Sequence, residues 1–77
     1  MKNQIIEQIR ENLIDIIPEL EGTTISNDET LLNIGANSID RAELIALTLE
    51  QLEKEIPRIE LAGAQTINEL AELIASK

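Results

Sequence analysis

The spacing of isoleucine and leucine constrains the fold of this chain more than any other feature. In the first segment, apolar residues recur at steps of three, four and three, which is the spacing of one helical face. These residues are Ile6, Ile9, Leu13 and Ile16. Pro18 disfavours helical geometry in the residue before it. We therefore expect a helix from about Asn3 to Ile17.

Two later segments show the same periodicity. The first should run from about Ser38 to Lys54, with a core stripe formed by Ala42, Ile45, Leu49, Leu52 and Ile56. The second opens with Thr66-Ile67-Asn68-Glu69, a capping box in which the threonine and the glutamate each satisfy a free amide of the first turn. Its apolar stripe is Ile67, Leu70, Ala71 and Ile74. A short helical turn is predicted over Ile59 to Ala62, closed by Gly63.

Residues 18–37 form a long connection rich in turn-forming residues. Structureless loops longer than about 12–15 residues are uncommon inside compact domains. We therefore expect apolar side chains to pin this loop to the core, namely Ile25, Leu31, Leu32 and Ile34. Gly35 would then permit a tight turn into the next helix. No run alternates with period two, so the sequence predicts an all-α bundle of three main helices and one short helix, in a single domain of residues 1–77.

The chain has no Phe, Tyr or Trp, so fourteen Ile and eleven Leu must supply most of the core. A domain of this size buries only about 60% of the surface of its unfolded chain. Such a domain can build a modest core, but it has little room for a deep catalytic cleft.

The charge balance restricts the possible partners. The chain carries 6 Lys and Arg against 15 Asp and Glu, a net charge of -9. This argues against nucleic acid, whose affinity depends on neutralising phosphates with Lys and Arg, and against anionic membranes. An acidic domain is instead steered quickly towards basic patches on other proteins. No apolar run approaches the ~20 residues that span a bilayer, and the N-terminus lacks the apolar core of a signal peptide. We expect a monomer in the cytoplasm.

Few side chains are suited to catalysis. The chain has no Cys and no His, so it lacks a thiolate nucleophile and the usual general base near neutral pH. The acidic stretch Ser26 to Glu29 lacks the ligand spacing and the closing Glu of an EF-hand loop. We expect neither an enzyme nor a metal site.

Ser38 is the candidate functional residue, within Gly35-Ala36-Asn37-Ser38-Ile39-Asp40. An isolated serine here would be interpreted as a helix cap, a role that Asn37 could equally fill. Attachment of a charged arm is favoured by the helix start, where the positive end of the helix stabilises a nearby anion, and by the small residues before the serine. At about 100° per residue, Ser38 projects over the end of the core stripe.

The predicted outward face of the same helix carries Asp40, Glu43, Leu47 and Glu50. Leu47 is apolar among carboxylates, which suits a docking site for a basic, partly apolar partner. A single exposed leucine is also ordinary on a solvated face, and the sequence leaves both interpretations open.

The segment from Leu31 to Asp40 resembles the acyl carrier protein signature, in which Gly-x-Asp-Ser-Leu surrounds a modified serine. Glu43-Leu44 and Glu55-Ile56-Pro57 also stand where that family has them, and the resemblance covers nearly the whole chain. It implies that a phosphopantetheinyl transferase moves 4′-phosphopantetheine from coenzyme A onto Ser38. The terminal thiol of that arm would hold acyl groups as thioesters, and so supply the thiol that this chain lacks.

Two positions depart from the family pattern. Asn37 replaces the usual Asp before the serine, and Arg41 adds a positive charge where most relatives have a small polar residue. Together with Ile56 to Ala64, these positions are similar to the free-standing donor carriers of polyketide β-branching cassettes. The resemblance implies that an acyltransferase supplies malonyl, which a ketosynthase-like partner decarboxylates to acetyl. An HMG-CoA-synthase-like enzyme then condenses that acetyl onto a β-keto intermediate held on another carrier.

This resemblance also implies a docking surface and a location in the bacterial cytoplasm. The docking residues would be Asp40, Arg41, Glu43, Leu44, Leu47, Glu50 and Arg58. Arg41 and Arg58 would discriminate among partners, because a reversed charge on a docking face repels wrong partners. The alternative for each is a surface ion pair worth under about 1 kcal/mol.

Three other functions remain open at this level. The chain could be a generic fatty-acid, peptidyl or D-alanyl carrier. It could be an unmodified acidic helical adaptor that only binds proteins, which leaves the signature around Ser38 unexplained. Phosphorylation of Ser38 would use the same helix-end electrostatics, but it leaves the rest of the resemblance unexplained.

Overall fold

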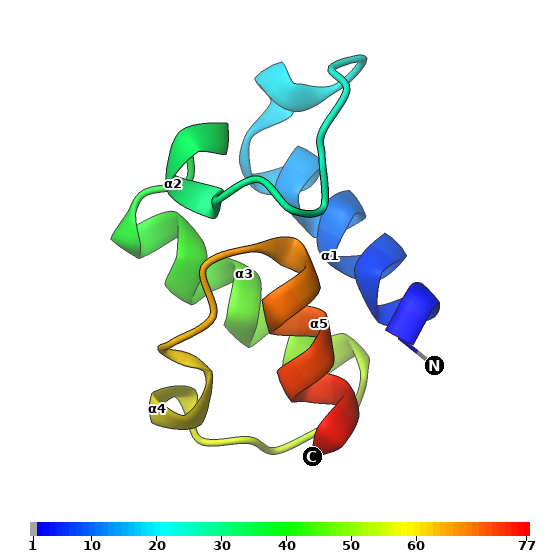
Figure 1. Ribbon diagram of the computed structural model, residues 1–77, viewed down its shortest axis with the longest axis vertical. Helices are drawn as coiled ribbons and strands as arrows, with labels where there is room; N and C mark the ends of the chain where they lie inside the picture. The colour runs from blue at the N-terminus through cyan, green and yellow to red at the C-terminus, as the bar shows by residue number, and fades with distance from the viewer. Residues whose placement is uncertain (1) are drawn as a thin grey trace.

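Three helices enclose an aliphatic core in the computed structural model, which describes residues 2–77 (Figure 1). Its elements are α1 (Lys2–Ile16), α2 (Leu31–Ile34), α3 (Ser38–Gln51), α4 (Arg58–Leu61) and α5 (Ile67–Ser76), with a 3-10 turn at Pro18–Leu20. No strand occurs among these residues, and one isolated bridge joins Thr30 to Thr66. The predicted all-α bundle of three main helices is confirmed, and α2 is an additional short helix inside the predicted loop.

Helix α1 is the central packing element, because it lies against both α3 and α5. Its buried apolar residues are Ile5, Ile6, Ile9 and Leu13. The predicted stripe of α5 is buried in full, and it comprises Ile67, Leu70, Ala71 and Ile74. The predicted periodicity of these two helices is therefore confirmed. Both Thr66 and Glu69 make the expected capping-box hydrogen bonds at the start of α5.

Helix α3 follows the prediction only in part, since Leu49 is the one member of the predicted stripe that is buried. The residues that it buries are Leu44, Thr48 and Leu49. Four members of the predicted stripe are only partly buried, namely Ala42, Ile45, Leu52 and Ile56. The physical reason is that α3 has neighbours on two sides, with α1 on one and the region of α4 on the other. Periodicity identifies an apolar face but does not say which neighbour packs more tightly against it.

The end of α3 also comes earlier than predicted, at Gln51 instead of Lys54. Glu53 adopts a left-handed backbone conformation, with φ of 55°. The Lys54 amide then donates to the Leu49 carbonyl at 2.9 Å. This closure satisfies a free carbonyl at the helix end, so no proline or glycine is needed there.

A buried polar contact joins α1 to α3. Asn12 Nδ2 donates to Thr48 Oγ1 at 2.9 Å, and both residues are buried. Gln8 Nε2 donates to Asn12 Oδ1 at 3.2 Å and to Gln51 Oε1 at 2.7 Å. Because buried polar groups are costly without partners, this chain of hydrogen bonds specifies how α1 and α3 align.

The long connection is held by polar contacts as well as by apolar ones. Arg10 Nη1 donates to the Ile25 carbonyl at 2.6 Å and to Asn27 Oδ1 at 2.8 Å. The Leu31 amide donates to the Gln65 carbonyl at 2.8 Å, which ties the connection to the start of α5. Of the predicted apolar anchors, Ile25 and Leu31 are buried and Ile34 is partly buried. Leu32 was predicted wrongly, because it is 68% exposed.

The Asn12–Thr48 contact gives a test of the fold. Asn12→Ala leaves the buried Thr48 hydroxyl without its donor, while Gln8 keeps its bond to Gln51, so we expect a loss of about 1–3 kcal/mol in the free energy of unfolding. Urea titration followed by circular dichroism measures this. Gln51→Ala is the control, since it removes only an exposed hydrogen bond. An equal loss in both variants would contradict the role of the buried pair.

Candidate functional site

The site is built at the corner between α2 and α3. Thr30 Oγ1 accepts from the Asn33 amide at 3.2 Å and so caps α2. Gly35 ends α2 in a left-handed conformation with φ of 117°, and its amide donates to the Leu31 and Leu32 carbonyls. No atom lies within 4 Å of where a Cβ of Gly35 would sit, so the backbone conformation alone favours glycine there. This left-handed turn redirects the chain into α3.

A capping box begins α3, and its cap is Asn37. Asn37 Oδ1 accepts from the Asp40 amide at 2.9 Å, and Asp40 Oδ2 accepts from the Asn37 amide at 3.4 Å. Ser38 follows as the first helical residue and is exposed. Of the two caps that the sequence allowed, the structure uses Asn37. The Ser38 hydroxyl is therefore not needed to cap the helix in the described part of the chain.

A cavity of about 220 Å³ opens beside Ser38. Its lining comes from α2, α3, α4, the α4–α5 connection and α5: Leu31, Ser38, Arg41, Ala42, Ile45, Arg58, Leu61, Ala62, Ala64 and Leu70. The partly buried face of α3 that the sequence assigned to the core forms one wall. Ser38 therefore lies over the end of this face, as predicted, and an arm attached to it can reach a largely aliphatic cavity.

Two arginines are among the residues that line this cavity, Arg41 and Arg58. Arg41 follows Ser38 by one helical turn on α3, and Arg58 is the first residue of α4. The Nε atom of Arg41 is buried and has no hydrogen-bond partner. The sequence placed both arginines on a docking surface; the structure brings both to the cavity beside Ser38.

The predicted docking residues divide between surface and core. Glu43 and Glu50 are exposed, and Leu47 is partly buried. Asp40 is partly buried and serves in the capping box. Leu44 was assigned wrongly to the docking surface, because it is 0% exposed. It faces the core, where α1 packs against α3.

Two exposed isoleucines were missed in the sequence. Ile39 on α3 is 76% exposed, and Ile59 on α4 is 82% exposed. Ile39 directly follows Ser38, and Ile59 directly follows Arg58. The sequence signal that could have found them is their position directly after Ser38 and Arg58, which were already candidate functional residues. Helical periodicity had assigned Ile59 only to a short turn.

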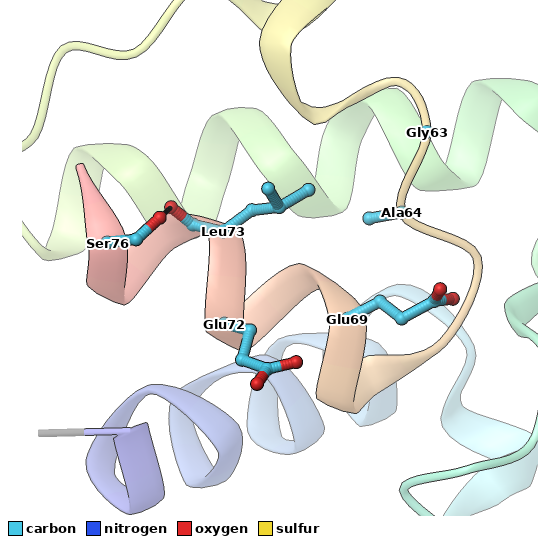
Figure 2. A pocket seen from close by; sticks show the side chains of 6 residues that line it. All are labelled: Gly63, Ala64, Glu69, Glu72, Leu73 and Ser76. Atoms are coloured by element: carbon cyan, nitrogen blue, oxygen red, sulfur yellow. Dashed lines mark hydrogen bonds between the residues drawn. The ribbon is translucent and has the colours of Figure 1, made fainter.

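A larger hollow of about 440 Å³ lies along α5 (Figure 2), and Ser38 is not among its lining residues. Its polar groups all have partners within the chain. Glu69 accepts from the Gln65 and Thr66 amides, and the Ser76 hydroxyl donates to the Leu73 carbonyl. Glu72 lies 3.9 Å from Lys2. In Figure 2, Leu73 and Ala64 point towards one another across this hollow, and no cation lines it. It therefore offers no cation that could bind an anion.

Comparison with known proteins identifies the family. A model of the phosphopantetheine attachment site matches residues 5–74. The chain is 43% identical over 76 residues to the polyketide biosynthesis acyl-carrier-protein AcpK of Bacillus subtilis (strain 168), covering 99% of this chain and 93% of that protein. This chain belongs to the acyl carrier proteins of the phosphopantetheine-attachment family.

A solved structure agrees with this assignment. The acyl carrier protein fold matches, with a TM-score of 0.95 and 43% identity, a chain in the crystal structure of the curacin biosynthetic pathway HMG synthase in complex with acetyl donor-ACP. The match covers 100% of this chain and 99% of that chain. Acyl carrier proteins carry a covalent 4′-phosphopantetheine and act as carriers rather than catalysts. Among residues 2–77, no helix combines the length and hydrophobicity needed to cross a bilayer.

The departure at Asn37 has a structural explanation in this acyl carrier protein. An amide oxygen caps a helix about as well as a carboxylate, so Asn37 keeps the capping role without adding to a net charge of -9. Asn37→Asp should therefore preserve the fold.

This explanation can be tested by stability. We expect Asn37→Ala to lower the free energy of unfolding by about 0.5–2 kcal/mol, because the Asp40 amide loses its acceptor. Asn37→Asp is the matched control and should stay close to the wild type. Urea titration of the three proteins compares them. A loss in Asn37→Asp as large as in Asn37→Ala would contradict capping as the function of this side chain.

Proposed function

We propose that Ser38 is the residue that carries the phosphopantetheine arm. The observation that supports this most directly is the geometry of its hydroxyl, which is exposed at the first residue of α3 and is relieved of capping by Asn37. The positive end of α3 also favours the phosphodiester that attachment creates. The residues present fit the group, since an aliphatic cavity and two cations adjoin the serine.

The arm supplies a terminal thiol for thioester cargo, which a chain without cysteine cannot provide itself. The contribution of the protein is to present that arm at the corner of α2 and α3 and to dock on other proteins. The cavity of about 220 Å³ beside Ser38 suits a short acyl group better than a long one.

We infer a donor role in polyketide β-branching. The support is the similarity to AcpK, which is named for polyketide biosynthesis, and to an acetyl donor carrier bound to an HMG synthase. In this role a phosphopantetheinyl transferase loads the arm and an acyltransferase supplies malonyl. A ketosynthase-like partner then removes CO2 to leave acetyl, which an HMG-CoA-synthase-like enzyme accepts. The protein would act as a monomer in the bacterial cytoplasm.

The docking surface that we propose lies on α3 and α4 around Ser38. It comprises Ile39, Asp40, Arg41, Glu43, Leu47, Glu50, Arg58 and Ile59. The two exposed isoleucines and the carboxylates of this surface match a partner with an apolar patch inside a basic rim. Such a rim charge accelerates association more than it strengthens the complex.

The attachment residue is tested by intact mass. After incubation with a broad-specificity phosphopantetheinyl transferase and coenzyme A, the wild type should gain one phosphopantetheine and Ser38→Ala none. Because Asn37 provides the cap, Ser38→Ala should unfold close to the wild type. Ser76→Ala is the matched control and should still be loaded. Loading of Ser38→Ala would overturn the assignment, and no loading of the wild type by an active transferase would favour an adaptor that binds proteins unmodified.

The docking surface is tested by acetyl transfer to an HMG-CoA-synthase-like enzyme. Glu43→Lys should lower the apparent second-order rate constant about tenfold, equivalent to ~1.4 kcal/mol, because it reverses a charge on the proposed docking surface. Glu11→Lys is the control, since this exposed residue on α1 gives the same change in net charge. Equal rates for the two variants would exclude a local role for Glu43. Loading without any transfer from the wild type would instead indicate a generic carrier.

A further inference from the structure

The six cationic side chains of this protein differ in whether they bond to other groups of the chain. Within residues 2–77, four of them bond to another group of the chain. Lys2 and Lys77 pair with Glu72 and Glu60, Arg10 bonds to Ile25 and Asn27, and Lys54 Nζ donates to the Ile74 carbonyl at 3.0 Å. Only Arg41 and Arg58 make no ion pair or side-chain hydrogen bond in this part of the chain.

These two arginines belong to the lining of one cavity. Both line the cavity that Ser38 adjoins, one from α3 and the other from the start of α4. In a chain with 15 Asp and Glu, unpaired arginines would be expected to find carboxylates if they served only as surface charges. Asp40 is instead held in the capping box. Glu43 makes no hydrogen bond or ion pair with either arginine in the described part of the chain.

The environment of Arg41 indicates a missing acceptor. Its Nε is buried without a partner, and leaving such a donor unsatisfied costs about 1–3 kcal/mol. Guanidinium groups bind phosphate and carboxylate oxygens through two parallel hydrogen bonds. An anion bound by Arg41 beside the cavity would therefore give this side chain a partner that the described part of the chain does not supply.

We propose that Arg41 and Arg58 form an anion-binding site for the arm that Ser38 carries. This rests on the proposed attachment at Ser38. The ligand is an anionic oxygen group, and the arm offers two sources: the phosphodiester at its base and the carboxylate at the end of a malonyl thioester. The phosphodiester is bonded to Ser38 Oγ, so it lies at the rim of the cavity in every loaded form. The carboxylate reaches the arginines only when the arm folds back into the cavity.

The consequence is control over where the arm lies. A bound phosphodiester would hold the base of the arm along the α3–α4 side of the molecule. A bound carboxylate would retain malonyl in the cavity and release the cargo after decarboxylation, because acetyl has no charge. The two arginines would then act on the arm itself, in addition to any contact with a partner.

Arginine NMR signals test this site without any partner enzyme. The chain has three arginines, so Arg10 is an internal reference that lies outside the cavity. Apo, holo, acetyl and malonyl forms are prepared, with loading verified by intact mass. We expect the Nε and Cζ signals of Arg41 and Arg58 to shift on loading while those of Arg10 stay in place. A shift from apo to holo identifies the phosphodiester, and a further shift from acetyl to malonyl identifies the carboxylate.

Variants provide a second readout from the arm. Arg41→Gln and Arg58→Gln should each shift the phosphorus-31 signal of the holo protein towards that of the same phosphodiester in holo protein unfolded with urea. Lys2→Gln, which removes the same charge far from the cavity, should leave that signal unchanged. Complete loading with unmoved Arg41 and Arg58 signals in all forms would overturn the site while leaving the attachment at Ser38 intact. Failure to load at all would instead overturn the proposed function.

Discussion

The reciprocal hydrogen bonds between Asn37 and Asp40 are the contact on which the functional end of this molecule depends. They begin α3 immediately after the left-handed turn at Gly35, and they satisfy the amides that a helix start leaves free. Because these two side chains do the capping, Ser38 is left exposed at the first position of the helix. The positive end of the 14-residue helix α3 therefore lies at this serine, where it would stabilise the phosphodiester of the proposed arm.

A protein without aromatic residues needs another means of specifying its packing. Aliphatic side chains fill the space between α1, α3 and α5, but their packing has little directional preference. The hydrogen bond from Asn12 to Thr48 adds direction, since it is satisfied in only one alignment of α1 and α3. That alignment turns Leu44 inwards and leaves Ala42 and Ile45 to line the cavity beside Ser38.

The distribution of charge separates two functions on one small surface. Most carboxylates are spread over the exterior, where they steer the protein towards basic partners. Two arginines are concentrated beside the serine, where a uniformly acidic surface would repel a phosphodiester. In the arrangement that we propose, an acidic carrier attracts basic partners and still accommodates an anionic arm.

Local patterns in the sequence determined the all-α class, the helices at both ends and the choice of Ser38 as the candidate functional residue. The stripe of α5 and its capping box are properties of residues within four positions of one another, so periodicity and side-chain chemistry suffice to predict them. The signature around Ser38 could also be recognised from the sequence, because Gly35, Asn37 and Asp40 lie within six consecutive residues and make only local contacts.

Only the tertiary structure decided what depends on the approach of distant segments. It assigned Leu44 to the core, exposed Leu32, and brought Arg58 to the cavity that Arg41 lines. It also chose Asn37 over Ser38 as the cap. Helical periodicity cannot make these distinctions, because a helix with neighbours on two sides carries apolar residues on both. Which of them is buried is set by how closely each neighbour packs, and that is fixed by contacts between residues far apart in the chain.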